Sequence, residues 1–180
     1  MNKKQKSPIP HKKLLRIALN YGSIMAIIGV VGFVLNNAFA DNRALASVIS
    51  IGTYVAAAFT VYYGVKKFKS DFGSLSMRDG LMLSLYTGVI SGLIISAYMY
   101  LYYYVISPEA IDKVMEHQRE ALEKLPQFQN QPNKIEEEVA KFRAGFPYYL
   151  LVGPIIGQSF IALLAGLTSA FMLKDQEPAR

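Results

Sequence analysis

Four stretches of this chain contain no Asp, Glu, Lys or Arg, and each is long enough to cross a lipid bilayer. A helix rises about 1.5 Å per residue, so about 20 apolar residues span a hydrocarbon core roughly 30 Å thick. Backbone N–H and C=O groups find no water inside lipid, and each stretch is therefore expected to be helical. The stretches are Ile17–Ala40, Ala44–Val65, Gly80–Pro108 and Ala144–Leu173, of 24, 22, 29 and 30 residues. Together they hold 105 of the 180 residues, which indicates an integral membrane protein.

The composition agrees with a membrane protein made of one compact unit. Charged residues make up 18% of the chain and hydrophobic residues 52%, whereas about 25% of a typical soluble domain is charged. Four spans within 180 residues leave no room for a second, soluble domain. The sequence contains no cysteine, which excludes disulfides, thiolate nucleophiles and cysteine metal ligands.

The net charge of +6 is distributed unevenly between the two sides of the expected spans. The segments before the first span, between the second and third, and after the fourth hold 12 Lys and Arg against four acids. The two segments on the opposite side hold seven bases against nine acids. Basic loops stay in the cytoplasm, so we predict an inner-membrane protein with both termini cytoplasmic.

The basic N-terminal tail is expected to hold the N-terminus in the cytoplasm and to touch anionic lipid of the bilayer. Nucleic-acid binding is disfavoured because no aromatic residue is interleaved with the lysines of this tail. The tail covers residues 1–13, the transmembrane domain 14–174, and a second cytoplasmic tail 175–180. The spans are expected at about 16–39, 44–65, 81–105 and 147–173.

Two connections between spans differ in length. Asp41, Asn42 and Arg43 join the first two spans so closely that these must form an antiparallel hairpin. The second and third spans are joined by a polar loop, Phe68–Asp79, for which we expect a turn at Gly73 and Ser74.

An alternative for the first span is a cleaved signal peptide. Ala38, Phe39 and Ala40 form an A-x-A site after a basic segment and an apolar run. The apolar run has 24 residues, however, whereas a signal core has about 7–15. A retained first span is favoured, and cleavage at Ala40 stays open.

The one long polar region, the outer loop at 107–143, is predicted to fold as a helical hairpin. Ser107 is expected to cap its first helix, with Pro108 at the first helical position. Apolar residues then recur at helical spacing on one face, a candidate interaction face that includes Ile111, Met115, Leu122 and Leu125. The predicted fold is thus an all-α membrane protein, a four-helix transmembrane bundle with an extracytoplasmic helical hairpin.

Small residues recur every four positions on three spans. Small side chains let helix backbones approach closely in lipid. They favour packing within the chain, and a dimer interface is the alternative. The positions are Gly52, Ala56, Thr60 and Gly64; Ser84, Gly88, Gly92 and Ser96; and Ala162, Gly166 and Ala170.

Polar residues within the spans are the remaining candidates for a site. Asn20 and Gln158 are the deepest strongly polar side chains, and Pro154 frees a backbone carbonyl near Gln158. Interhelical hydrogen bonds are the simpler interpretation, at about 0.6 kcal/mol each. The threonines Thr53, Thr60, Thr87 and Thr168 are weaker candidates.

No catalytic, cofactor or metal site is predicted. His11 and His117 fall on opposite sides of the membrane in this topology, so they cannot share a metal ion. Glu136, Glu137 and Glu138 are best explained as a solvated helix face. Phosphate-binding loops, nucleophile elbows and H-E-x-x-H motifs are absent from the sequence.

The sequence resembles a bacterial membrane family, the domain-of-unknown-function 4199 family, over roughly Leu14 to Lys174. Four short motifs carry the resemblance: Tyr21-Gly22, Tyr63-Gly64-Val65-Lys66-Lys67-Phe68, the segment Phe72–Leu81, and Ser107-Pro108-Glu109-Ala110-Ile111. The resemblance implies a four-span inner-membrane protein and assigns no catalytic residue.

Two functional hypotheses follow from these features. The first is a non-enzymatic protein that acts by assembly with itself or with another membrane protein of the cell envelope, because apolar and small-residue faces are present. The alternative is a small transporter or channel for a neutral or apolar solute, since the charge-free spans disfavour ion coupling.

Overall fold

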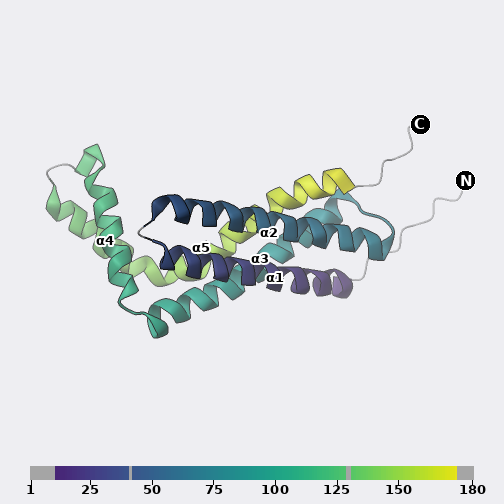
Figure 1. Cartoon of the computed structure of the whole chain (residues 1–180), viewed down its shortest axis with the longest axis horizontal. Helices are drawn as coiled ribbons and strands as arrows, with labels where there is room; N and C mark the ends of the chain where they lie inside the picture. Colours follow the sequence, from purple (N-terminus) through teal and green to yellow (C-terminus); the bar gives the residue numbers. More distant parts are fainter. Residues whose placement is uncertain (1–10, 41, 129–130, 174–180) are drawn as a thin grey trace, which may run out of the picture. The chain divides into compact units, whose positions relative to one another are not determined.

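The computed structural model describes residues 11–40, 42–128 and 131–173, and the regular structure in these residues is entirely helical. Four helices are long and apolar enough to cross a membrane, which confirms the predicted all-α fold with four spans. The elements are α1 (His11–Ala38), α2 (Arg43–Phe72), α3 (Met77–Leu101), the π-helix η1 (Tyr102–Ile106), α4 (Ala110–Glu123), the 3₁₀-helix η2 (Pro126–Phe128) and α5 (Pro132–Leu173) (Figure 1). The two terminal tails, for which a cytoplasmic location was predicted, lie outside the described residues apart from residues 11–13.

The helices group into two compact units. Unit 1 contains α1, α2, α3 up to Ile94 and α5 from Ile155 onward. Unit 2 runs from Ile95 to Pro154 and contains the end of α3, η1, α4, η2 and the first part of α5.

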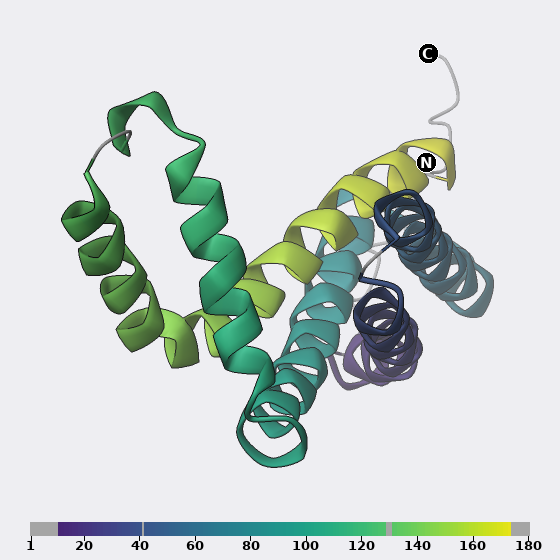
Figure 2. The same ribbon diagram turned by 60° about the vertical axis from the view of Figure 1, so that its left-hand side comes forward.

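In unit 1, α1 and α2 form an antiparallel hairpin and lie side by side (Figures 1 and 2). Contacts between the two helices define the antiparallel register of this hairpin, because residue numbers rise along α1 by nearly as much as they fall along α2. The contacting pairs are Lys13 with Phe72, Tyr21 with Gly64, Gly32 with Thr53, and Asn36 with Ser50. The tight connection depends on Asn42, whose side-chain oxygen accepts a hydrogen bond from the Leu45 amide at 3.1 Å and caps α2.

Small residues bring α3 against α5 within unit 1. A Cβ atom built on Gly80 would lie 2.7 Å from the Cβ of Ala170, and one built on Gly88 would lie 2.6 Å from the Cα of Ser159. Between these levels, Gly166 faces Ser84. The small-residue faces of these two helices therefore serve packing within the chain, as favoured from the sequence.

The apolar core of unit 1 lies among these four helices. Its largest fully buried side chains include Phe68, Met25, Leu83, Val61 and Val65. Gly22 of α1 lets that helix approach α3, because a Cβ there would lie 2.9 Å from Ile90.

Four helix ends meet at one end of unit 1. The start of α1 reaches the end of α2, since Lys13 Nζ lies 5.7 Å from the centre of the Phe72 ring. Lys69 of α2 donates from Nζ to the carbonyl of Leu173, at the end of α5, at 2.7 Å. We call this the basic end; its described charged residues are Lys12, Lys13, Arg16, Lys66, Lys67, Lys69, Arg78, Asp71 and Asp79.

A polar loop was predicted at Phe68–Asp79. Its predicted beginning is wrong, because α2 continues to Phe72. Phe68 is fully buried and packs on Phe72 with ring centroids 4.7 Å apart, so burial of these aromatic rings extends the helix. Gly73 then ends α2 with φ 67°, a left-handed conformation that glycine adopts without strain. Ser76 caps α3 by accepting a hydrogen bond from the Asp79 amide at 3.1 Å.

Unit 2 contains the predicted helical hairpin, in which α4 lies beside the first part of α5 (Figure 2). Asp112 pairs with Arg143 at 2.6 Å, and seven residues further along α4, Arg119 pairs with Glu136 at 2.7 Å, seven residues earlier on α5. Seven residues are about two helical turns, so the two pairs define an antiparallel register. The second helix of the hairpin continues into the fourth span, and α5 is unbroken through Pro147 and Pro154.

The entry to the hairpin differs from the prediction. The expected cap at Ser107 is wrong, because α3 passes into η1 and α4 begins only at Ala110. The Ser107 amide donates to the Tyr102 carbonyl at 2.8 Å, a contact that closes the π-helix. The Ser107 hydroxyl instead donates to Oε1 of Glu109 at 2.5 Å.

Candidate functional site

The structure places the predicted polar residues in different surroundings. Asn20 lies in a groove between α1 and α2 at the basic end. Gln158 lies on α5 in unit 1, where its backbone carbonyl faces Gly88 of α3. Pro154 is one turn earlier on α5 and belongs to unit 2. Asn20 and Gln158 therefore do not form one site.

The groove at Asn20, called the basic groove below, has a volume of about 620 Å³. Its polar lining comes from both helices of the α1–α2 hairpin, and three apolar residues, Ile17, Ile24 and Phe72, complete it. The polar residues are Lys13, Arg16, Asn20, Tyr21, Lys67 and Asp71.

The charges of the basic groove are only partly compensated. Lys67 Nζ lies 2.7 Å from Asp71 Oδ1, one turn away on the exposed side of α2. Lys13 lies over the ring of Phe72 in a cation–π contact. Among the described residues, Arg16 makes no hydrogen bond or ion pair, and its side chain is exposed. Three bases against one acid leave the groove positive, so it can bind an anion through charge-assisted hydrogen bonds.

The shape of the groove is set by a close contact on its floor. The ring of Tyr21 packs on Gly64, where a Cβ would lie 3.2 Å from the ring carbon Cγ. Gly22, the next residue, packs on α3. These contacts explain two of the motifs that carry the family resemblance, because they fix how α1 lies against its neighbours.

A second polar feature is buried between α3 and α5 in unit 1. Ser91 Oγ and Gln158 Oε1 are buried and have no hydrogen-bond partner among the described residues. Both lie close to the Gly88 contact along their helices. Leaving a buried polar group unpaired costs about 1–3 kcal/mol. The Ser91 hydroxyl is free to donate one hydrogen bond, and Gln158 Oε1 is free to accept one.

The sequence had not singled out Ser91, although it is next to Gly92 on the small-residue face. The other hydroxyls distinguish it. Thr53, Thr60, Thr87 and Thr168 each donate to the carbonyl four residues earlier on their own helix, at 2.8–3.1 Å. The threonine hydroxyls are therefore satisfied within their own helices, and not by the interhelical hydrogen bonds expected from the sequence.

The candidate interaction face of α4 is largely covered by the hairpin itself. Met115 and Leu122 are buried within unit 2, Ile111 is half-buried, and Leu125 is 42% exposed. On α5, Ile135 and Val139 are the buried residues at the levels that the ion pairs bring opposite Leu122 and Met115. Met115, Leu122, Ile135 and Val139 therefore form the interior of the hairpin.

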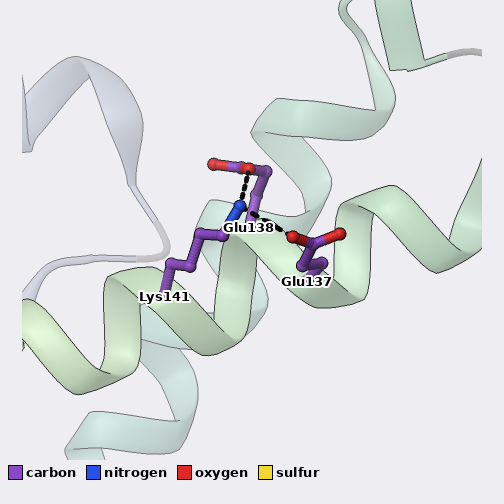
Figure 3. Close-up of polar contacts among 3 residues, drawn as sticks. All are labelled: Glu137, Glu138 and Lys141. Carbon is purple, nitrogen blue, oxygen red and sulfur yellow. Dashed lines mark hydrogen bonds and ion pairs between the residues drawn. The ribbon is translucent and has the colours of Figure 1, made fainter.

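The acidic run on α5 is held in exposed ion pairs. Lys141 Nζ lies 2.8 Å from Glu137 Oε1 and 2.9 Å from Glu138 Oε1, and Figure 3 shows the lysine reaching both carboxylates. Glu136 pairs with Arg119 of α4. In residues 11–40, 42–128 and 131–173, no three His, Asp or Glu side chains are placed to hold a metal ion.

Aromatic residues from the end of the third span and from the start of the fourth meet in unit 2. Tyr103 of η1 is buried and packs edge-on against Phe146 of α5, with ring centroids 5.2 Å apart. The tyrosine-rich end of the third span and the aromatic start of the fourth thus lie at the same level, as an aromatic belt requires.

Comparison with known proteins gives a family but no relative of known activity. No curated protein and no solved structure matches the chain. Residues 20–175 match a family model described as "Protein of unknown function (DUF4199)". Because the match covers most of the sequence, the chain belongs to the DUF4199 family.

Proposed function

We propose that this protein is a multi-pass protein of the inner membrane, with both termini cytoplasmic, that acts without catalysis by assembling with copies of itself or with another membrane protein of the cell envelope. Apolar side chains on the outer helix surfaces support the membrane location. Ile27, Val48 and Phe160 are more than 60% exposed, and only lipid or another apolar surface can cover them favourably. The gathering of seven bases at the basic end supports the orientation.

Open glycines on the helix surfaces carry the assembly proposal. Gly22, Gly64, Gly80, Gly88 and Gly166 each face another helix of the chain. At Gly52 of α2 and Gly157 of α5, in contrast, no other helix among the described residues comes within 4 Å of the position of a Cβ.

An exposed glycine weakens a helix by about 1 kcal/mol relative to alanine. In lipid it also allows a second helix to approach closely. Large exposed side chains flank both positions: Ile51 and Val55 beside Gly52, and Ile156 and Phe160 near Gly157. A glycine between bulky neighbours gives a partner helix a notch to fill, which favours these two surfaces as the places of assembly.

Single-molecule photobleaching of the full chain in liposomes, at increasing protein density, tests this proposal. We expect oligomers in the wild type. Gly52→Leu or Gly157→Leu should weaken association about tenfold, because a leucine prevents close helix approach. Ala97→Leu is the control, since it also places a leucine at an exposed position of a long helix but removes no glycine. A wild type that stays monomeric at every density, with no partner captured by crosslinking in native membranes, would contradict assembly.

The unpaired atoms of Ser91 and Gln158 favour one alternative, a transporter or channel for a neutral solute. Solute flux measured in proteoliposomes tests this alternative. Loss of the flux in Gln158→Leu or Asn20→Leu would support transport. Thr168→Val serves as the control, because the Thr168 hydroxyl is already bonded within its own helix. Equal flux in empty liposomes and in proteoliposomes would rule out transport of that solute.

A further inference from the structure

We propose that the basic groove binds one anionic phospholipid, with its phosphate among Lys13, Arg16 and Lys67 and its acyl chains directed along α1 toward Ile24. This proposal is independent of assembly, because the groove lies within the α1–α2 hairpin of a single chain. The recognised chemistry is a phosphate diester that carries an apolar tail.

The charge of the basic groove matches a phosphate diester. Its three bases exceed its one acid by two charges, and Lys67 already shares its charge with Asp71. Arg16 is exposed, and within the described part of the chain it has no partner. Its guanidinium can therefore offer two parallel N–H donors to phosphate oxygens. Lys13, three residues earlier, lies on the same face of α1.

The order of residues along the groove matches the order of groups in a lipid. Arg16 and Lys67 flank the charge-free stretches of α1 and α2, where phosphates of a bilayer would lie. Asn20 and Tyr21 follow one turn further along α1 and can meet ester and glycerol oxygens. Ile24 lies about 12 Å beyond Arg16 along the helix, is 47% exposed and is apolar. Because a free phosphate would use only the charged part, this gradient favours a lipid.

The site is built rather than a diffuse basic surface. Lys13 is held over the ring of Phe72, and the packing of Tyr21 on Gly64 sets the distance between the two helices. A volume of about 620 Å³ is large enough for a glycerophosphate headgroup. Binding should therefore depend on which base is removed and not only on the total charge.

The sequence contains no tryptophan, so the fluorescence of one introduced tryptophan can report on lipid in the groove. Ile24→Trp places the single tryptophan of the chain at the apolar end of the groove. In nanodiscs of full-length protein, we expect brominated phosphatidylglycerol to quench this tryptophan at a much lower mole fraction than brominated phosphatidylcholine. Equal quenching by the two lipids would overturn the proposal.

Paired charge variants, made on the Ile24→Trp background, separate a site from general electrostatics. Arg16→Gln should raise the apparent Kd for phosphatidylglycerol about tenfold, because charge-assisted hydrogen bonds are lost. Lys66→Gln removes the same charge from an exposed lysine that does not line the groove, and it should change the Kd less than about twofold. Equal effects of the two variants would show that no specific site exists.

Two further measurements complete the test. Lys13→Gln gives a second groove variant, and it should weaken binding in the same way even if Arg16→Gln fails to fold. Millimolar inorganic phosphate should not release the lipid. Displacement of the lipid by inorganic phosphate would show a site for soluble phosphate and would overturn the proposal of a lipid.

Discussion

At the scale of single residues, we expect the substitution of glycine by alanine to have opposite effects on stability at two positions. Gly88→Ala should destabilise the protein by about 1–3 kcal/mol, because the added methyl group meets the backbone of α5 at 2.6 Å from the Cα of Ser159. Gly52→Ala should stabilise it by up to about 1 kcal/mol, since alanine favours helix and the position is open. Unfolding of the monomer in mixed micelles measures both. If the two variants were equally stable, the close α3–α5 contact would be disproved.

Glu109 gives a prediction for pH. The hydrogen bond from the Ser107 hydroxyl lowers the pKa of Glu109 below the ordinary value of 4.5. A lowered carboxyl pKa means that this contact stabilises the hairpin entry above pH 4.5. The contribution is lost as the pH falls through the lowered pKa of the folded state.

Ser107→Ala should raise the pKa of Glu109 back toward 4.5, as followed by the carboxyl carbon shift of isotopically labelled glutamate. Ser107→Thr keeps the hydroxyl and serves as the control, with little change expected. A pKa that is the same in Ser107→Ala and the wild type would assign the shift to another cause.

At the scale of elements, the ion pairs of unit 2 should couple α4 to α5. Asp112→Ala and Arg143→Ala should each increase hydrogen exchange of the α4 amides, and the double variant should exchange less than the two effects added together. The coupling free energy should be about 0.2–1 kcal/mol, because both side chains are exposed to solvent.

The matched control is a cycle with Lys124→Ala in place of Asp112→Ala. Lys124 is exposed, and it follows the last residue of α4. We expect no coupling between Lys124 and Arg143. Equal coupling in the two cycles would argue against the antiparallel register.

The sequence predicted where the long helices occur better than it predicted which helices contact one another. Charge-free length predicted all four long helices, because the bilayer imposes it directly. The end of α2 was misplaced, since Phe68 is buried by packing that charges nearby in the sequence do not reveal. Met115 and Leu122 gave an apolar stripe on α4, but a stripe alone does not show that the partner is another helix of the same chain.

The candidate sites show the same limit. Asn20 was singled out for its depth, whereas Lys13, Arg16 and Lys67 were assigned only to topology. The basic groove needs the α1–α2 register, which brings Lys13 to the level of Phe72, 59 positions later in the chain. No local pattern contains that register, because it depends on small-residue contacts such as Tyr21 with Gly64.

At the scale of the whole molecule, the charge distribution predicts which ends of the helices face the cytoplasm. The absence of cysteine from the sequence makes single-cysteine labelling direct. Ser70→Cys lies exposed on α2 at the basic end, and Ala121→Cys lies exposed on α4 of the hairpin. A membrane-impermeant maleimide added to intact spheroplasts should label Ala121→Cys, and it should label Ser70→Cys only after lysis.

The expected pattern has a physical cause. The segments on the side of the basic end hold 12 bases against four acids, and the opposite segments hold seven against nine, so moving the basic segments across the membrane is the costlier choice. The wild type, with no cysteine, gives the background in each preparation. Labelling of both variants before lysis would contradict the predicted topology, and labelling of Ser70→Cys alone would indicate the reverse orientation. The basic groove would then lie in the other leaflet, where anionic headgroups are fewer.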